Sequence, residues 1–492
     1  MKSTENSIEK NWMQNVIKEE EIKKYLNNGK DFINDSLILE KLNSNKNPDS
    51  SRILEIIDKS LGLERLTPDE TAALINLDFK EEELWSKIFE AAKKIKEKVY
   101  GRRIVTFAPL YISNYCVNNC EYCGYRKSNS EIIRKQLTKK ELQNEIISLV
   151  NEGHKRLIIS FGEHPKSDAK YIADVLEIIY NTKTEKGEIR RANVNASPFS
   201  ISDLKLLKDV GIGTYQVFQE TYNHSLYSKV HTEGLKANYQ WRLYALHRSL
   251  EAGADDVGIG ALFGLADWKF EIMGLLYHTI DLEDKFGGVG PHTISFPRLE
   301  PAVATPFNDN WSFKVNDECF KKIVAILRLA VPYTGLILTC RETPEIRNEV
   351  LELGVTQLDF GSNIGIGEYS THGRNTAKQQ FLLNDNRSLD EGVRWLASKG
   401  HIVSFCTAGY RCGRTGHYFM DIAKQGKVHS LCMPNAILTY REYLNDYASE
   451  ETKKIGEKLI EKELAAIENS ELKNIVSEFL IKIENGERDL YV

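Results

Sequence analysis

The sequence lacks a long apolar segment and shows no excess of either charge. Its best apolar stretch, IVAILRLAV, is interrupted by Arg328, so we expect no membrane-spanning helix. The 65 Lys and Arg residues nearly balance 70 Asp and Glu residues, giving a net charge of −5 and no reason to expect nucleic acid or a membrane as a partner. The first 24 residues are polar and lack the apolar stretch expected of a secretion signal, and we find no short repeat or low-complexity segment. We therefore expect a cytoplasmic protein whose eight cysteines are reduced, as metal ligands or buried apolar groups.

The composition is that of an ordinary globular protein. Of the 492 residues, 41% are hydrophobic and 27% are charged, which excludes disorder for most of the chain. This length allows about three domains, or one large α/β barrel with flanking pieces.

The pattern along the chain favours the barrel. Up to about residue 100 the chain is predicted to be helical, with a capping box from Thr67 and proline at the first helical position. Short β-branched runs then alternate with amphipathic segments, and further capping boxes begin at Thr138 and Ser388. The eight predicted strands are 103–108, 156–160, 192–195, 214–219, 256–262, 292–297, 336–340 and 357–361.

Eight strand-then-helix units predict an α/β fold, a (β/α)8 TIM-type barrel. We place it at residues 101–400. A helical N-terminal extension, residues 1–100, precedes it, and a mainly helical C-terminal domain with a cysteine-bearing loop, residues 401–492, follows.

The most informative motif is CVNNCEYC, which places Cys116, Cys120 and Cys123 directly after the first predicted strand. Chemistry in a barrel takes place at the C-terminal ends of the strands, where this loop lies. Three thiolates in a reducing compartment favour a soft metal. A structural zinc site needs a fourth ligand, for which His154 or Cys340 could serve. A [4Fe–4S] cluster held by three cysteines instead leaves one iron open to a substrate or cofactor.

The C-x3-C-x2-C spacing, with the aromatic Tyr122 before the last cysteine, resembles the signature of the radical S-adenosylmethionine (radical SAM) superfamily. The resemblance implies that the open iron binds S-adenosylmethionine, which is cleaved to methionine and a 5′-deoxyadenosyl radical. It also implies that Gly162 and Glu163, just after the second strand, meet the methionine amino group. A Gly-Glu pair is also common in ordinary loops, where the glutamate binds no cofactor.

Further cofactor contacts are implied at the fourth strand and the following helix. Gln219, Glu220 and Tyr222 would approach the ribose and carboxylate of the cofactor. Arg248 could meet the same carboxylate, although an arginine there also suits a solvated helix face.

Within the superfamily, the chain resembles the aromatic amino acid lyases, closest to the HydG family of [FeFe]-hydrogenase maturases and more distantly the ThiH family. Matching segments recur from about Phe32 to the C-terminus, among them GPHTISFPRL, AVPYTGLILTCRE and CMPNAILTYREYLNDY. The resemblance implies cleavage of the Cα–Cβ bond of tyrosine to p-cresol and dehydroglycine. It further implies a second iron–sulfur cluster in the C-terminal domain, where dehydroglycine becomes carbon monoxide and cyanide for the hydrogenase H-cluster. The catalytic residues would include Tyr111, His292 and Arg298.

The second cluster site departs from the family pattern. HydG-type chains read CTACYR, whereas this chain reads CTAGYRC, so that Cys406 and Cys432 match but the middle ligand is Gly409. Cys412 could replace it only in a rebuilt loop, and we expect a weak or empty cluster site. His292 matches the histidine associated with the extra iron of that cluster, although a core histidine is equally compatible with its position.

The segment expected to contact the substrate also departs from the family pattern. The family segment PRLRP offers two arginines, and here the second is Glu300, which would repel a substrate carboxylate. Either Arg298 serves instead, or Glu300 points outward, or the substrate is not tyrosine.

The leading hypothesis is a radical SAM carbon–carbon lyase acting on tyrosine or a related amino acid, with a reducing electron donor and hydrogenase maturation partners. One alternative is a paralogue without an intact second cluster, ThiH-like in its product or acting on another amino acid. Another is a non-catalytic iron–sulfur scaffold or sensor.

Overall fold

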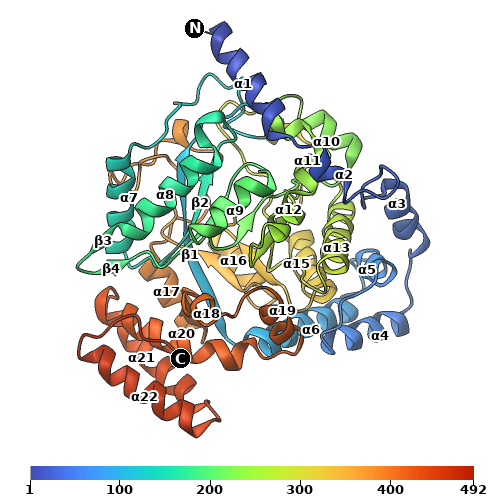
Figure 1. The fold of residues 1–492 in the computed structure, drawn as a ribbon. Helices are drawn as coiled ribbons and strands as arrows, with labels where there is room; N and C mark the ends of the chain where they lie inside the picture. Colours follow the sequence, from blue (N-terminus) through green and yellow to red (C-terminus); the bar gives the residue numbers. More distant parts are fainter. Residues whose placement is uncertain (1) are drawn as a thin grey trace.

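The computed structural model describes residues 2–492 and contains a closed barrel of eight parallel strands (Figure 1). The barrel strands are β1 (Arg103–Ser113), β2 (Arg156–Phe161), β5 (Arg191–Asn195), β6 (Tyr215–Gln216), β7 (Val257–Gly260), β8 (Thr293–Ser295), β9 (Gly335–Leu338) and β10 (Gln357–Asp359). Pairing of β10 with β1 closes the barrel. Each strand overlaps one of the eight predicted ones, so the predicted (β/α)8 fold is confirmed.

A helix follows each barrel strand and covers the outside of the barrel. In chain order these helices are α7 (Lys139–Asn151), α8 (Ala169–Asn181), α9 (Ile201–Asp209), α12 (Ala245–Glu251), α13 (Trp268–Lys285), α15 (Asp317–Ala330), α16 (Pro344–Val350) and α17 (Leu389–Ser398). The capping boxes expected at Thr138 and Ser388 are present at α7 and α17.

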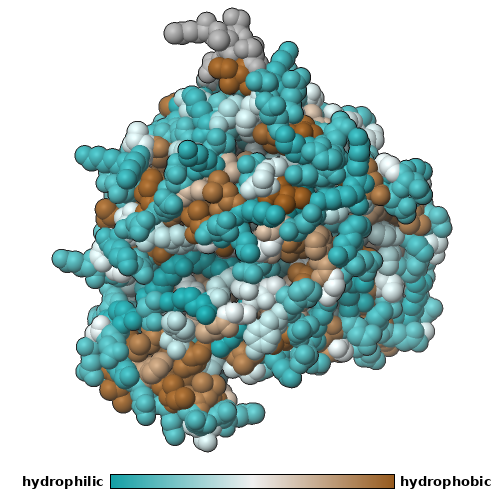
Figure 2. Space-filling model, viewed as in Figure 1, coloured by the Kyte–Doolittle hydropathy of each residue, from teal (hydrophilic) through white to brown (hydrophobic). Residues whose placement is uncertain are grey.

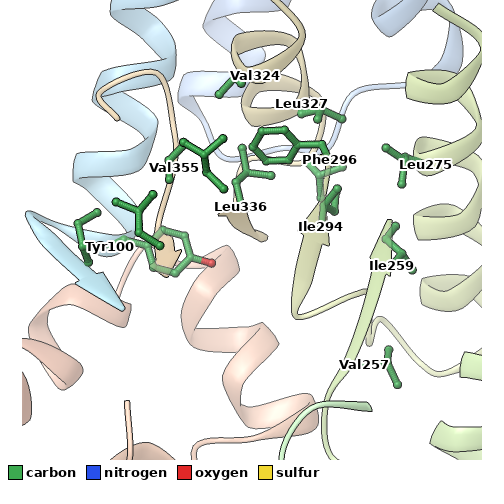
Figure 3. Close-up of a cluster of buried hydrophobic side chains, with 14 of the residues drawn as sticks. Tyr100, Val257, Ile259, Leu275, Ile294, Phe296, Val324, Leu327, Leu336 and Val355 are labelled. Carbon is green, nitrogen blue, oxygen red and sulfur yellow. The ribbon is translucent and has the colours of Figure 1, made fainter. Parts of the chain in front are cut away.

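Alternate residues of each strand face outward, because side chains along a strand point to opposite sides. Ile259 of β7 and Ile294 of β8 are fully buried in the layer between strands and helices. Figure 3 shows this layer, with Leu275 of α13 and Leu327 of α15 on its helical side. The inward-facing residues are thereby left to line the barrel interior, where the candidate site lies.

Helices precede and follow the barrel, as predicted. The N-terminal helices are α1 (Lys2–Val16), α2 (Glu20–Lys23), α3 (Asp35–Ser44), α4 (Ser50–Leu61), α5 (Pro68–Ile75) and α6 (Glu82–Tyr100). The C-terminal part contains β11 (Ile402–Ser404), α18 (Ala408–Arg411), α19 (Gly416–Lys424), α20 (Val428–Asp446), α21 (Glu450–Ala465) and α22 (Ser470–Glu484). Strand β11 pairs with the first residues of β1, which fixes this part beneath the barrel.

The remaining elements are short. They are the hairpin β3 (Lys183–Thr184) and β4 (Gly187–Glu188), the helices α10 (His224–Val230), α11 (Tyr239–Leu243) and α14 (Phe307–Asn310), and three 3-10 turns. The face drawn in Figure 2 is largely hydrophilic, with apolar residues scattered over it and most concentrated over the C-terminal helices at lower left. Within residues 2–492, no helix is both long and apolar enough to span a bilayer.

Candidate functional site

A cavity of about 170 Å³ opens at the C-terminal ends of the barrel strands. Cys116, Cys120 and Cys123 all line it, together with inward-facing residues of most barrel strands. The structure therefore brings the three cysteines of the motif together where barrel enzymes place their chemistry.

The cysteine loop is held against the end of β2 by a close backbone contact. A Cβ atom added to Gly162 would lie 2.2 Å from the backbone oxygen of Tyr115, so only glycine fits there. The backbone nitrogen of Val117 donates to the backbone oxygen of Glu163 at 2.9 Å. The Gly-Glu pair thus supports the cysteine loop as well as facing the cavity.

The donor set fits a cluster that has three cysteine ligands. Burial raises the pKa of Cys116 to about 12 and raises that of Cys120, so both are thiols unless a metal stabilises the thiolate. Within the described residues, no three His, Cys, Asp or Glu groups are close enough to surround a single ion. Thiolates of a four-iron cluster bind different iron atoms, so three cysteines that line one cavity without surrounding a single point suit a cluster.

Two ion pairs stand beside the cysteines. Glu163 accepts from Nη1 of Arg242 at 2.6 Å and from Nδ2 of Asn118 at 2.8 Å. Glu220 accepts from Nζ of Lys236 at 2.7 Å. Burial alone would raise the pKa of Glu220, but the charges of Lys236 and Arg242 outweigh it and lower the pKa. Glu220 is therefore ionised at neutral pH, and both carboxylates line the cavity, where an ammonium or hydroxyl group of a ligand could reach them.

A tyrosine, an amide and an arginine also line the cavity, and Nε2 of the amide, Gln380, is 3.4 Å from the sulfur of Cys123. The hydroxyl of Tyr111 donates to Oε1 of Gln380 at 3.0 Å. Arg341 lies over the ring of Phe381, with its guanidinium carbon 3.4 Å from the ring centre. Nη1 of Arg341 donates to the backbone oxygen of Arg298 at 3.5 Å, and no carboxylate among the described side chains forms an ion pair with it, so its charge is available to an anionic ligand.

Several residues predicted for cofactor binding lie outside the lining of this cavity. The hydroxyl of Tyr122 is 2.9 Å from Nε2 of His231, and its ring packs behind Cys120. The side-chain amide of Gln219 is buried without a hydrogen-bond partner. Tyr222 contacts His278 of α13 on the outer side of the barrel.

The two predicted arginines are likewise occupied elsewhere. Arg248 is fully buried, donates to the backbone oxygens of Phe199 and Trp241, and stacks on Trp241. Nε of Arg298 donates to Glu342 at 2.9 Å, and Nη1 donates to Asp317.

Glu300 does not line the cavity. Its carboxylate accepts from Nδ2 of Asn384 at 2.9 Å. Of the three alternatives for Glu300, this placement favours an orientation away from the substrate.

The second set of predicted metal ligands lies at the opposite, N-terminal end of the barrel. Cys406, Cys432 and His292 line a small cavity with Gly409, whereas the Cys412 sulfur is directed to the backbone oxygen of Val492, 3.8 Å away. Only two thiols face this cavity, so the residues present do not fit a cluster with three cysteine ligands.

One cavity residue that the sequence analysis did not identify, Arg341, could have been found from the alternation of side chains along β9 and the residues that follow it. Arg341 has the same parity as Ile337 and Thr339, which line the cavity. Asn118, Lys236, Arg242 and Gln380 reach the cavity from loops and a short helix far apart in the sequence, and no sequence pattern indicated them.

Comparison with known proteins agrees with this geometry. Residues 110–274 match the radical SAM superfamily, and residues 295–402 match the biotin and thiamin synthesis associated domain. A crystal structure of HydG, a maturase of the [FeFe]-hydrogenase, is 49% identical, covers 94% of this chain and all of its own, and superposes with a TM-score of 0.90. HydG from Carboxydothermus hydrogenoformans is 39% identical over 94% of this chain and 99% of its own, with a TM-score of 0.78. A 2-iminoacetate synthase of Salmonella typhimurium is 27% identical over 70% of this chain and 88% of its own length.

Proposed function

Because the chain belongs to the HydG family of radical SAM enzymes, we propose that it cleaves the Cα–Cβ bond of tyrosine, or of a closely related amino acid, to p-cresol and dehydroglycine. The observation behind this proposal is the single cavity that joins the three-cysteine motif to an unpaired arginine, Arg341. An amino acid carboxylate is the natural bidentate partner for such a guanidinium.

In this proposal Cys116, Cys120 and Cys123 hold a [4Fe–4S] cluster. The cluster and S-adenosylmethionine, when bound, supply the radical that abstracts hydrogen from the substrate. Glu163 would accept a hydrogen bond from the ammonium group of the cofactor, and Asn118 and Arg242 hold the Glu163 carboxylate in place.

The substrate lies beside Arg341 and Tyr111. Arg341 binds its carboxylate, and the Tyr111–Gln380 pair fixes the orientation of its polar groups. The surrounding Phe107, Ile158 and Ile337 side chains exclude water from the reacting atoms.

The onward conversion to carbon monoxide and cyanide is where this chain differs. With Gly409 in place of a thiol ligand and Cys412 turned away, we propose that dehydroglycine is released and that carbon monoxide and cyanide yields are low. A role in hydrogenase maturation would then require another protein for that conversion.

The test is anaerobic assay of the reconstituted full-length protein with S-adenosylmethionine, dithionite and tyrosine. We expect 5′-deoxyadenosine and p-cresol in comparable amounts, and loss of both products in Cys120→Ala. Cys319→Ala is the matched control, because Cys319 is a buried free thiol on α15 outside the cavity. 5′-Deoxyadenosine without p-cresol would refute tyrosine as the substrate, and neither product from the unmodified protein would refute the enzyme itself.

A further inference from the structure

One side-chain amide lies between the cysteine motif and a tyrosine of the same cavity. Nε2 of Gln380 is 3.4 Å from the sulfur of Cys123, and Oε1 of Gln380 accepts from the hydroxyl of Tyr111 at 3.0 Å. All three residues line the cavity. The amide of Gln380 therefore connects a motif cysteine with a tyrosine that faces the ligand space.

The two neighbours fix which way this amide is turned. Burial raises the pKa of Tyr111, so its hydroxyl stays protonated at neutral pH and donates to Oε1. With Oε1 bound to Tyr111, the NH2 group of Gln380 faces the sulfur of Cys123. The reverse orientation would place the amide oxygen against that sulfur, and two acceptors repel one another when the cysteine is a thiolate.

The backbone of Gln380 is held against the cysteine loop without help from its side chain. The backbone nitrogen of Gly124, the residue after Cys123, donates to the backbone oxygen of Gln380 at 3.1 Å. A Cβ atom added to Gly124 would lie 2.6 Å from that oxygen, so this close approach requires glycine. The hydroxyl of Tyr125 donates to the backbone oxygen of Lys378 at 2.9 Å. None of these contacts uses the sulfur, so they keep the amide beside Cys123 whether it is a free thiol or a metal ligand.

An N–H group beside a cluster ligand affects how readily the cluster accepts an electron. In the proposed function Cys123 is a thiolate ligand of the [4Fe–4S] cluster. Reduction adds negative charge, part of which resides on the sulfur atoms, and a hydrogen bond donated to such a sulfur stabilises that charge. Hydrogen bonds to the sulfurs are among the factors that set the reduction potential of a cluster. The amide of Gln380 should therefore raise the reduction potential.

We propose that Gln380 sets the reduction potential of the motif cluster by donating a hydrogen bond from Nε2 to the sulfur of Cys123. Tyr111 is then a positioning residue for this contact, because its hydroxyl holds the amide in the required orientation. The inference rests on the cluster of the proposed function, but it depends neither on tyrosine as the substrate nor on the bond that is cleaved.

The test is a redox titration of the reconstituted full-length protein, followed by EPR spectroscopy, without S-adenosylmethionine or amino acid. Gln380→Leu removes the donor, and reduction should become about tenfold less favourable, which lowers the potential by about 59 mV for one electron. Gln380→Glu places a carboxylate oxygen in place of the donor and should lower the potential at least as far. Tyr111→Phe should lower it by less, because the amide keeps its N–H groups and loses only the partner that orients them.

Gln379→Leu is the matched control. Gln379 is the preceding amide of the same loop and does not line the cavity, so its replacement should leave the potential unchanged. Iron analysis of each variant shows whether the cluster is present. About four iron atoms per chain with equal potentials in the unmodified protein and in Gln380→Leu would overturn the inference and leave the proposed function standing. An equal fall in Gln379→Leu would overturn it as well, and an unmodified protein without a cluster would overturn both proposals.

A spectroscopic measurement detects the hydrogen bond directly. In protein whose glutamine side chains carry ¹⁵N, pulsed EPR of the reduced cluster should show a ¹⁵N coupling transmitted through the Gln380 amide. This coupling should be absent in Gln380→Leu and retained in Gln379→Leu. The same spectrum from the unmodified protein and Gln380→Leu would refute the contact itself.

Discussion

Replacing Gly409 by cysteine should restore a third thiol at the N-terminal end of the barrel. Gly409 lines both small cavities there, and a Cβ atom added to it would have Arg414 Cβ, 4.0 Å away, as its nearest neighbour. Its φ is not positive and it lies in the helix α18, so the substitution introduces no backbone strain. Losing a helical glycine should change stability by less than about 1 kcal/mol, in the favourable direction.

The expected gain is therefore in metal, not in folding. The unmodified protein should contain about four iron atoms per chain and Gly409→Cys about eight, since each [4Fe–4S] cluster holds four. Iron and sulfide analysis with Mössbauer spectroscopy measures this, and carbon monoxide yield from tyrosine should rise in parallel. Arg411→Cys is the control, because it adds an exposed thiol to the same short helix outside both cavities. Two clusters per chain and stoichiometric carbon monoxide from the unmodified protein would refute the reasoning.

Three further predictions concern other parts of the molecule. Glu163→Gln should weaken S-adenosylmethionine binding about 30-fold, which corresponds to ~2 kcal/mol for a buried charge-assisted contact. Glu283→Gln, which changes a buried ion-paired carboxylate outside the cavity, should leave that binding unchanged. Equal affinities of the two variants for S-adenosylmethionine in equilibrium binding would contradict the role of Glu163. Arg341→Met should raise the KM for tyrosine in steady-state kinetics about 10- to 100-fold, while Arg298→Met changes it far less. If Arg298→Met has the larger effect, the substrate carboxylate is bound by Arg298 and not by Arg341. Burial lowers the pKa of Lys96 to about 7, so the folded state binds fewer protons than the unfolded state above that pH, and stability should rise between about pH 7 and 10. Urea unfolding should show this rise to be smaller in Lys96→Met, and an unchanged pH profile would assign the effect to other groups.

The barrel was predictable because its pattern is local. Runs such as RLIIS and DVGIGAL have the length and β-branched content of buried strands, and the capping boxes at Thr138 and Ser388 fix helix starts within one residue. The cysteine motif was equally readable, since a loop that follows a barrel strand must lie at the C-terminal end.

The orientations of the side chains around that motif were not predictable in the same way. Arg242 and Arg248 lie on neighbouring short helices, and nothing in their sequence context shows that Arg242 reaches Glu163 while Arg248 is turned toward Trp241. Tyr222 follows a strand, but its backbone nitrogen and hydroxyl are bound by Glu271 and His278 of α13, which direct it outward. These orientations depend on tertiary packing between segments distant in the sequence.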